Sequence, residues 1–181
     1  PEERPIEWLE KKKREMPRIL FNAQYMNDPS GMRGVKYDLL WLQYYLETDL
    51  PPLSEMVGVQ AADPATSEKK SAHYFGHSTL GKHVSTGIVY VLGLTFGRIP
   101  AAEHLDFLRT QYDFWRGRGL YIREVILETG GPQQGTSDML MVQTRTDPKG
   151  AMPLTTKTPK GSKEVRFDAA IPFISNGTVR F

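Results

Sequence analysis

The succession of three strand-like segments and one amphipathic helix constrains the fold of this chain most strongly. The helix is expected over 100–115, because leucine and aromatic side chains recur there at helical spacing and Pro100 suits a first turn. The strand-like segments, rich in apolar and β-branched side chains, are residues 57–62, 73–80 and 87–96. Together these segments predict an α/β domain.

Further elements are expected after this helix. A fourth strand is predicted over 121–128, a short helix over 137–143 and a fifth strand over 153–157. A last helix is predicted over 163–170, ending before Pro172. The resulting order, βββαβαβα, is that of a ribonuclease-H-like mixed sheet flanked by helices, in which the first strand is central and the fourth lies beside it.

The N-terminal part of the chain differs in character from this sheet region. Residues 5–16 predict a short helix that begins at a proline and ends before Pro17. Segment 47–55 lacks periodicity and carries two prolines, which indicates a domain boundary. We therefore expect a helical extension over 1–52, the tail of something larger, and a sheet domain over 53–181.

The composition excludes several kinds of site. A length of 181 residues with 39% apolar content suffices for one core and little more. Because the chain has no cysteine, disulfides, thiolate zinc sites and cysteine nucleophiles are excluded. The sequence contains neither an apolar stretch of membrane-spanning length nor a phosphate-binding loop of the form G-x-x-x-x-G-K-S/T. We expect a soluble intracellular protein without ATP-driven activity of its own.

Two acidic residues end separate strand-like segments. Asp63 follows the first apolar run and precedes a polar turn, and Glu128 follows the apolar run 125–127 and precedes a glycine-rich turn. Acids at strand ends are commonly solvated, but both turns would leave a carboxylate at the open end of one sheet, where ligand sites tend to lie. Divalent-metal nucleases collect their ligands in this way, so Asp63 and Glu128 are the candidate catalytic and metal-binding residues.

Other polar residues are weaker candidates. His73 and His77 share one face of a strand at a spacing that permits zinc binding, but no cysteine accompanies them, so structural or surface roles are favoured. His104 is expected to be exposed in the first turn of its helix. Asp138 and Asp168 are candidates for a third metal ligand, although capping or solvation of a helix is the favoured role for each.

Positive charge gathers toward the C-terminus. The net charge of the chain is only +2, but from Arg145 onward seven basic residues stand against three acidic ones. Such a stretch could contact a phosphate backbone, and a solvated face would account for it equally well. The candidate DNA contacts are Lys157, Lys160, Lys163 and Arg166.

Four short segments carry a resemblance to a known family. They are FNAQYMNDP at 21–29, VGVQAADPA at 57–65, VILE at 125–128 followed by GPQ at 131–133, and the stretch from Lys160 through Arg166 to Val179. All four resemble segments of the large terminase subunit of tailed bacteriophages. In that order, they are similar to the passage from the ATPase domain to the linker, the first strand of the nuclease domain, its second acidic strand, and its late basic helix with the strand that follows. The likeness to this DNA-packaging motor protein spans nearly the whole chain.

The resemblance implies a function and a set of partners. In that family the C-terminal domain is a ribonuclease-H-like endonuclease that cuts concatemeric double-stranded DNA with two Mg²⁺ or Mn²⁺ ions, in the cytoplasm of the bacterial host. Motif position carries the metal-ligand roles onto Asp63 and Glu128. The implied partners are the ATPase domain that would precede residues 1–52, the small terminase subunit and the portal of the capsid.

The sequence departs from the family's pattern at two places. Relatives carry a third acid beyond the strand that Thr178 begins, whereas this chain ends at Phe181, so the sheet domain is expected to be truncated and its third ligand missing. Many relatives also have an acid near 71–74, where this chain reads SAHY. We therefore expect weak metal binding and poor cleavage by the isolated chain. The alternatives are a non-catalytic DNA-binding or assembly fragment, such as a prophage remnant, and another ribonuclease-H-like nuclease, such as a resolvase.

Overall fold

The chain divides into two compact units. The computed structural model describes residues 5–16, 18–26, 39–64, 74–129 and 134–181. One unit is Leu50–Pro159, and the other consists of Pro1–Asp49 together with Lys160–Phe181. The expected domains, 1–52 and 53–181, stay a prediction, because compactness alone does not show which segments fold independently. In the described ranges, no helix has the length and apolar character needed to cross a membrane.

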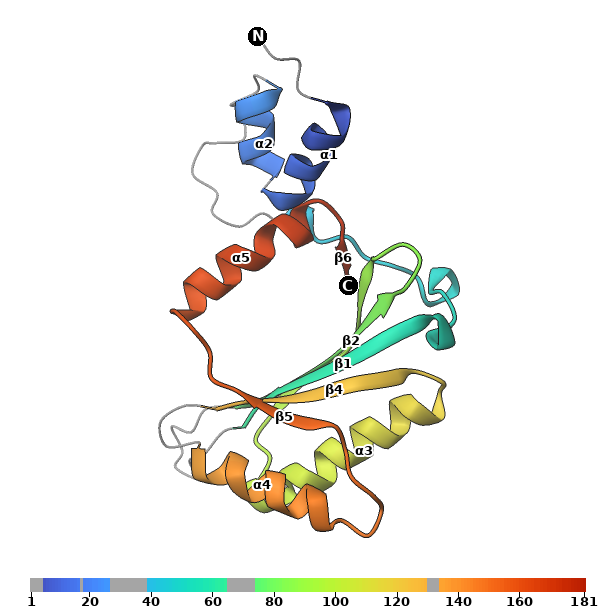
Figure 1. Ribbon diagram of the computed structural model, residues 1–181, viewed down its shortest axis with the longest axis vertical. Helices are drawn as coiled ribbons and strands as arrows, with labels where there is room; N and C mark the ends of the chain where they lie inside the picture. The colour runs from blue at the N-terminus through green and yellow to red at the C-terminus, as the bar shows by residue number, and fades with distance from the viewer. Residues whose placement is uncertain (1–4, 17, 27–38, 65–73, 130–133) are drawn as a thin grey trace. The chain divides into compact units, whose positions relative to one another are not determined.

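The Leu50–Pro159 unit is built on a mixed sheet (Figure 1). Its strands are β1 (Met56–Asp63), β2 (Phe75–His83), β3 (Val89–Gly97), β4 (Tyr121–Glu128) and β5 (Leu154–Lys157). They lie in the order β5-β4-β1-β2-β3. β2 pairs antiparallel with β1 and β3, and β4 pairs parallel with β1 and β5. The predicted ribonuclease-H-like arrangement, with the first strand central and the fourth beside it, is confirmed.

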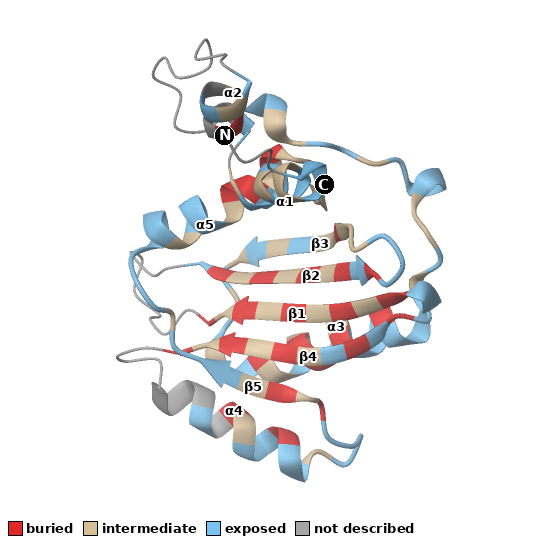
Figure 2. Cartoon of the chain, turned by 45° about the horizontal axis from the view of Figure 1, so that its top comes forward, coloured by how far each residue is buried: buried red, intermediate tan, exposed pale blue. Residues whose placement is uncertain are grey.

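Buried and less buried residues alternate along the strands β1, β2 and β4 of this sheet, as Figure 2 shows by colour. Side chains alternate between the faces with a period of two. Along β1, every second residue from Met56 to Ala62 is buried, on the face covered by α3 (His104–Gly117) and α4 (Gln134–Thr146). The other face carries Asp63 on β1 and Glu124 and Glu128 on β4, and all three are half-buried. We call this second side of the sheet the acidic face.

Helix α3 follows the three-residue turn Ala101–Glu103 and buries one stripe against the sheet. Leu108, Tyr112 and Trp115 are buried on it, as the helical spacing in the sequence predicts. The prediction that His104 is exposed is wrong. His104 is 0% exposed, its Nε2 lies 3.0 Å from the carbonyl oxygen of Ile99, and its ring centroid is 4.7 Å from that of Phe75. The preceding turn aims the first residue of the helix inward.

In its described residues, the second unit has the α-helices α1 (Ile6–Glu15), α2 (Arg18–Tyr25) and α5 (Lys163–Ser175), the short strand β6 (Val179–Arg180) and two 3-10 turns, Leu39–Trp41 and Glu47–Asp49. The predicted N-terminal helix is confirmed. Aromatic rings hold α1 to α2, with the centroids of Trp8 and Tyr25 5.7 Å apart. The Asn176 side-chain amide donates to the carbonyl oxygen of Arg14 at 3.1 Å, which ties the end of α5 to α1.

The end predicted for α5 is wrong, because the helix continues through Pro172. A proline inside a helix removes one backbone hydrogen bond and is normally unfavourable. Here Ile171, Pro172 and Ser175 are buried, so packing of the last turn outweighs the lost bond. At the other end, the Ser162 hydroxyl accepts a hydrogen bond from the backbone N–H of Val165 at 3.3 Å and caps the helix.

Candidate functional site

Asp63 and Glu128 end adjacent parallel strands in the same register. Ala62 lies opposite Leu127 in the pairing of β1 with β4, so the two acids occupy the next positions of that pairing. Ala62 and Leu127 are both buried on the helix-covered face. Since side chains alternate along a strand, both carboxylates project from the acidic face. Neighbouring strands lie roughly 4.8 Å apart, which suits two carboxylates that share one cation.

The backbone around these acids is held by pairing on both sides. Asp63 is paired with Gly76 of β2, and Glu128 with Lys157 of β5. Directly after Glu128, the backbone N–H of Thr129 donates to the carbonyl oxygen of Lys157 at 2.9 Å. Thr129 is 2% exposed, and its hydroxyl lies 3.2 Å from that of Thr158. The ends of the strands that carry the acids are therefore part of a continuous ladder.

One row of residues crosses the whole sheet at the level of these acids. Lys157 pairs with Glu128, Asp63 lies beside Glu128, Asp63 pairs with Gly76, and Gly76 pairs with Phe96 of β3. Residues opposite one another in a ladder share a face, so these five positions lie side by side on the acidic face. We call Lys157, Glu128, Asp63, Gly76 and Phe96 the acid row. It places a cation at one end, two carboxylates in the middle and an aromatic ring at the other end.

Glu124 adds a third carboxylate to the acidic face. Its Oε1 accepts a hydrogen bond from the Thr155 hydroxyl at 2.7 Å, and its Oε2 lies 3.3 Å from Nζ of Lys157. The hydrogen bond from Thr155, followed by that from Lys157, holds the pKa of Glu124 below its ordinary value. Glu124 precedes Glu128 by four residues, roughly 13 Å along a strand, so it anchors Lys157 and does not share a ligand position with Asp63. Glu124 was not among the predicted site residues, although its spacing of four from Glu128 along one strand could have indicated it.

Asp63 and Glu128 belong to no larger cluster of candidate metal ligands within the described residues. In the ranges that the structure describes, no cluster of three histidine, cysteine or acidic residues could hold a metal ion. Asp138 lies in α4, and Asp168 lies in α5 of the other unit, so their predicted roles stay predictions. His73 lies outside the described residues. His77 is 4% exposed and lies on the helix-covered face, where burial lowers its pKa to about 4.

The candidate DNA contacts are distributed over both units. Lys157 lies on the acidic face next to Glu128 and is exposed. Lys160, Lys163 and Arg166 belong to the other unit, in and just before α5. A contact of these four residues with DNA stays a prediction.

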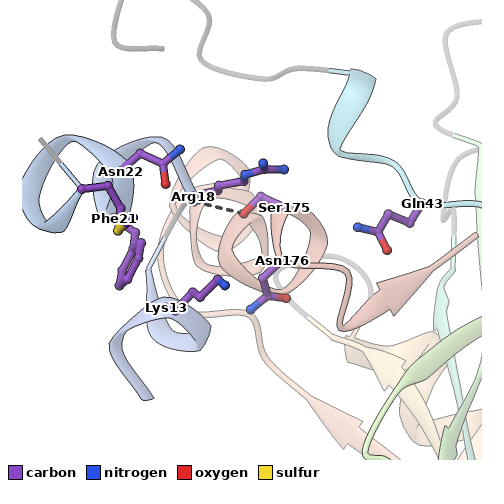
Figure 3. Close-up of a pocket in the computed structure, with 8 residues that line it drawn as sticks. Lys13, Arg18, Phe21, Asn22, Gln43, Ser175 and Asn176 are labelled. Atoms are coloured by element: carbon purple, nitrogen blue, oxygen red, sulfur yellow. Dashed lines mark hydrogen bonds between the residues drawn. The ribbon is translucent and has the colours of Figure 1, made fainter. Parts of the chain in front are cut away.

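Each of the two units contains a hollow. The second unit has a cavity of about 300 Å³ between α1, α2 and the end of α5, lined by polar side chains that include Arg18, Asn22 and Asn176 (Figure 3). On the sheet, an apolar hollow of about 500 Å³ is lined by residues of β1, β2, β3 and β4, among them Val57, Leu80 and Arg123. Val57 and Arg123 stand near the starts of their strands, so this hollow lies at the end opposite the acids.

Comparisons with known proteins bear on this fold. No family model matches the chain, and no curated protein matches its sequence. Among solved structures, the P22 large terminase nuclease domain superposes with a TM-score of 0.50 at 9% identity, over 80% of this chain and 69% of that one. The human cytomegalovirus terminase nuclease domain, solved after a manganese soak and with an inhibitor bound, has a TM-score of 0.50 at 13% identity, over 76% of this chain and 70% of that one. The fold is that of a terminase nuclease domain.

At such low identities the likeness concerns the fold alone. It confirms the ribonuclease-H-like terminase nuclease fold that the sequence motifs predict. Within that terminase nuclease fold, the roles of Asp63 and Glu128 depend on the register described above and stay predictions.

Proposed function

We propose that this chain is the metal-dependent endonuclease domain of a viral DNA-packaging terminase, which cuts double-stranded DNA. The observation that carries the proposal is the register of β1 with β4, which aligns Asp63 and Glu128 on one face at the ends of adjacent parallel strands. The terminase nuclease fold supports it. The ATPase domain, the small terminase subunit and the portal would then be its partners in a bacterial host, as the resemblance implies.

The residues at this position fit a hard divalent cation. Carboxylate oxygens are the ligands that Mg²⁺ and Mn²⁺ prefer, and Mg²⁺ is usually held by one or two carboxylates together with substrate phosphates. Asp63 and Glu128 would hold such an ion from two strands. The bound ion would supply an activated water and stabilise the leaving oxygen of the phosphodiester.

The remaining contacts of the chain position the substrate. Lys157 pairs with Glu128 in the ladder, and its exposed ammonium group, bound to Glu124 on the same face, could receive a phosphate there. Glu124 stays ionised through its bond to Thr155 and holds the lysine on the acidic face. Side chains placed on paired strands keep their geometry better than side chains on loops, so the ladder itself prepares the site.

A non-catalytic DNA-binding role is the second candidate. It is favoured by the lack of a cluster of three ligating side chains in the part of the chain that the structure describes. On this reading the acidic face would bind DNA or a partner without cutting.

Manganese binding and plasmid nicking test the proposal together. Mn²⁺ affinity is measured by electron paramagnetic resonance, and nicking is measured on supercoiled plasmid with Mn²⁺. Asp63→Asn and Glu128→Gln are expected to lower the Mn²⁺ affinity at least about tenfold, since each removes one charged ligand, and to abolish a nicking activity that is slow in the unsubstituted chain. Asp113→Asn is the matched control, because Asp113 is exposed on α3.

The two candidates separate clearly in this experiment. Nicking that survives both Asp63→Asn and Glu128→Gln would contradict the proposed site. DNA binding without Mn²⁺ binding or nicking by the unsubstituted chain would support the non-catalytic role instead.

A further inference from the structure

Exposed aromatic and cationic side chains gather at the β3 end of the acid row. Phe96 is 82% exposed, and Leu94 on the same strand is 66% exposed. Tyr74 is 59% exposed and directly precedes β2, and the guanidinium carbon of Arg98 lies 5.6 Å from the centroid of its ring. Because Phe75 pairs with Gly97, Tyr74 and Arg98 continue the two strands just beyond the acid row. Phe96, Tyr74 and Arg98 form what we call the aromatic corner.

Gly76 leaves a gap between this corner and Asp63. A Cβ atom built at Gly76 would meet no heavy atom of the described residues within 4 Å. Gly76 lies within the paired part of β2, where any residue can adopt the backbone conformation, so the chain itself does not require glycine there. The gap lets an extended ligand pass from the carboxylates to the ring of Phe96.

We propose that the acid row binds one strand of nucleic acid, with an unpaired base stacked on Phe96 and the neighbouring phosphate beside Asp63 and Glu128. Two strand spacings, roughly 10 Å, separate Asp63 from Phe96 along the row, a length that adjacent nucleotides can bridge. Arg98 contacts the backbone at one end of the row and Lys157 at the other. The inference deepens the proposed function, on which its placement of the phosphate rests.

The chemistry of the row favours a nucleic acid strand over other occupants. Aromatic rings stack with bases of any sequence, and arginine beside a ring contributes both stacking and phosphate attraction. Lys157 at one end of the row, Arg98 just beyond its other end, and a carboxylate pair that would hold a divalent ion can all attract phosphates, while the ring of Phe96 offers a base a stacking surface. A protein partner would gain little from the same surface, because the carboxylates at its centre oppose burial in an apolar contact.

Single-strand binding without divalent ions tests this inference separately from nuclease activity. The affinity for a fluorescently labelled oligothymidine and for a duplex of equal length is measured by anisotropy in EDTA, in a background of Asp63→Asn with Glu128→Gln, whose amides do not repel the phosphate as two bare carboxylates would. Phe96→Ala is expected to weaken binding of the single strand about tenfold, the loss typical of one base–aromatic stack, and to leave duplex binding nearly unchanged. Phe96→Trp keeps a stacking ring and should preserve the affinity.

Two further variants sharpen the test. Gly76→Val fills the gap with a side chain that suits a strand, so it should fold and yet weaken single-strand binding. Tyr121→Ala is the matched control, because Tyr121 is 66% exposed and pairs with Val57 at the opposite end of the same face. Its affinity should stay within about twofold of the original, since no base reaches it.

Crosslinking identifies the stacked residue directly. Light-activated 5-iodouracil in the oligonucleotide is expected to attach to the peptide that carries Phe96 or Tyr74. The inference is overturned if Phe96→Ala leaves single-strand affinity unchanged, or if it weakens single strand and duplex equally. A change of oligomeric state in Phe96→Ala with unchanged DNA affinity would also overturn it, and would assign the corner to a second copy of the chain. If the chain does not bind Mn²⁺, these DNA-binding results can still be interpreted, because the binding measurement requires no metal.

Discussion

His77 and His104 belong to a buried ring cluster beneath the sheet. The ring centroid of His77 lies 5.4 Å from that of Phe107, which lies 5.2 Å from that of Phe75. Burial lowers the pKa of both histidines, that of His77 to about 4. Within the described residues, Nε2 of His77 and Nδ1 of His104 have no hydrogen-bond partner. Both rings are therefore neutral in the folded chain near pH 7.

Acid is expected to destabilise the sheet unit through these histidines. The unfolded chain takes up the proton near pH 6.5, whereas folded His77 does so only near pH 4. Stability is thus unaffected above pH 6.5 and falls between about pH 6.5 and pH 4, by about 1.4 kcal/mol per pH unit for one such group. Urea unfolding at pH 7 and pH 5 measures this loss. His77→Leu should flatten the dependence, and parallel curves for the two proteins would contradict the account.

The position of a single residue was predictable from sequence where the periodicity of a strand determines it. Asp63 and Glu128 were predicted to end neighbouring strands because each ends an apolar run, and the pairing of β1 with β4 puts them side by side, while their metal-binding roles stay a prediction. The burial of His104 could not be found, since it depends on how the turn before α3 directs the helix toward Phe75. The aromatic corner was also missed, because the register of β3 with β2 is a tertiary property.

At the scale of elements, one ion pair joins α3 to the turn after α4. Arg109 is 5% exposed, and its Nε and Nη2 donate to one Asp147 carboxylate oxygen at 3.0 and 2.7 Å. Nη2 also donates to the carbonyl oxygen of Gly150. The N–H of Lys149 donates to the same carboxylate and, with Arg109, lowers the pKa of Asp147. These contacts fix the turn that leads into β5 to helix α3.

Removing the arginine of this pair should loosen that turn. Arg109→Met is expected to lower the Tm by roughly 5 °C or more, because the carbonyl of Gly150 and the Asp147 carboxylate lose their buried donor. Differential scanning calorimetry measures the shift. Arg116→Met on the exposed side of α3 is the control, with a change near zero. An equal decrease of the Tm in both variants would contradict a stabilising role of the ion pair between Arg109 and Asp147.

Element types were more predictable than element ends. Period-two alternation and helical spacing identified the order of strands and helices, because both patterns arise locally from which face is buried. The end of α5 was misjudged, since the burial of Ile171 and Ser175 keeps the helix going past Pro172. The burial of the last turn therefore outweighs the helix-breaking effect of the proline, and this burial cannot be read from the sequence.

At the scale of the whole molecule, the fold is shared with terminase nuclease domains although only 9% and 13% of aligned residues are identical. A sheet with one covered face requires a pattern of apolar and polar positions, and many sequences satisfy that pattern. The grouping of Lys160–Phe181 with the N-terminal segment was not predictable, because it arises from contacts such as that of Asn176 with the backbone of Arg14. Such contacts join residues far apart in the chain.

The location of manganese in a soaked crystal tests the central claim most directly. Anomalous scattering from Mn²⁺ is expected to give a peak between the carboxylates of Asp63 and Glu128, and the peak should vanish in Asp63→Asn. Manganese bound elsewhere, with the region between these two carboxylates empty, would contradict the assignment of Asp63 and Glu128 as the metal-binding residues.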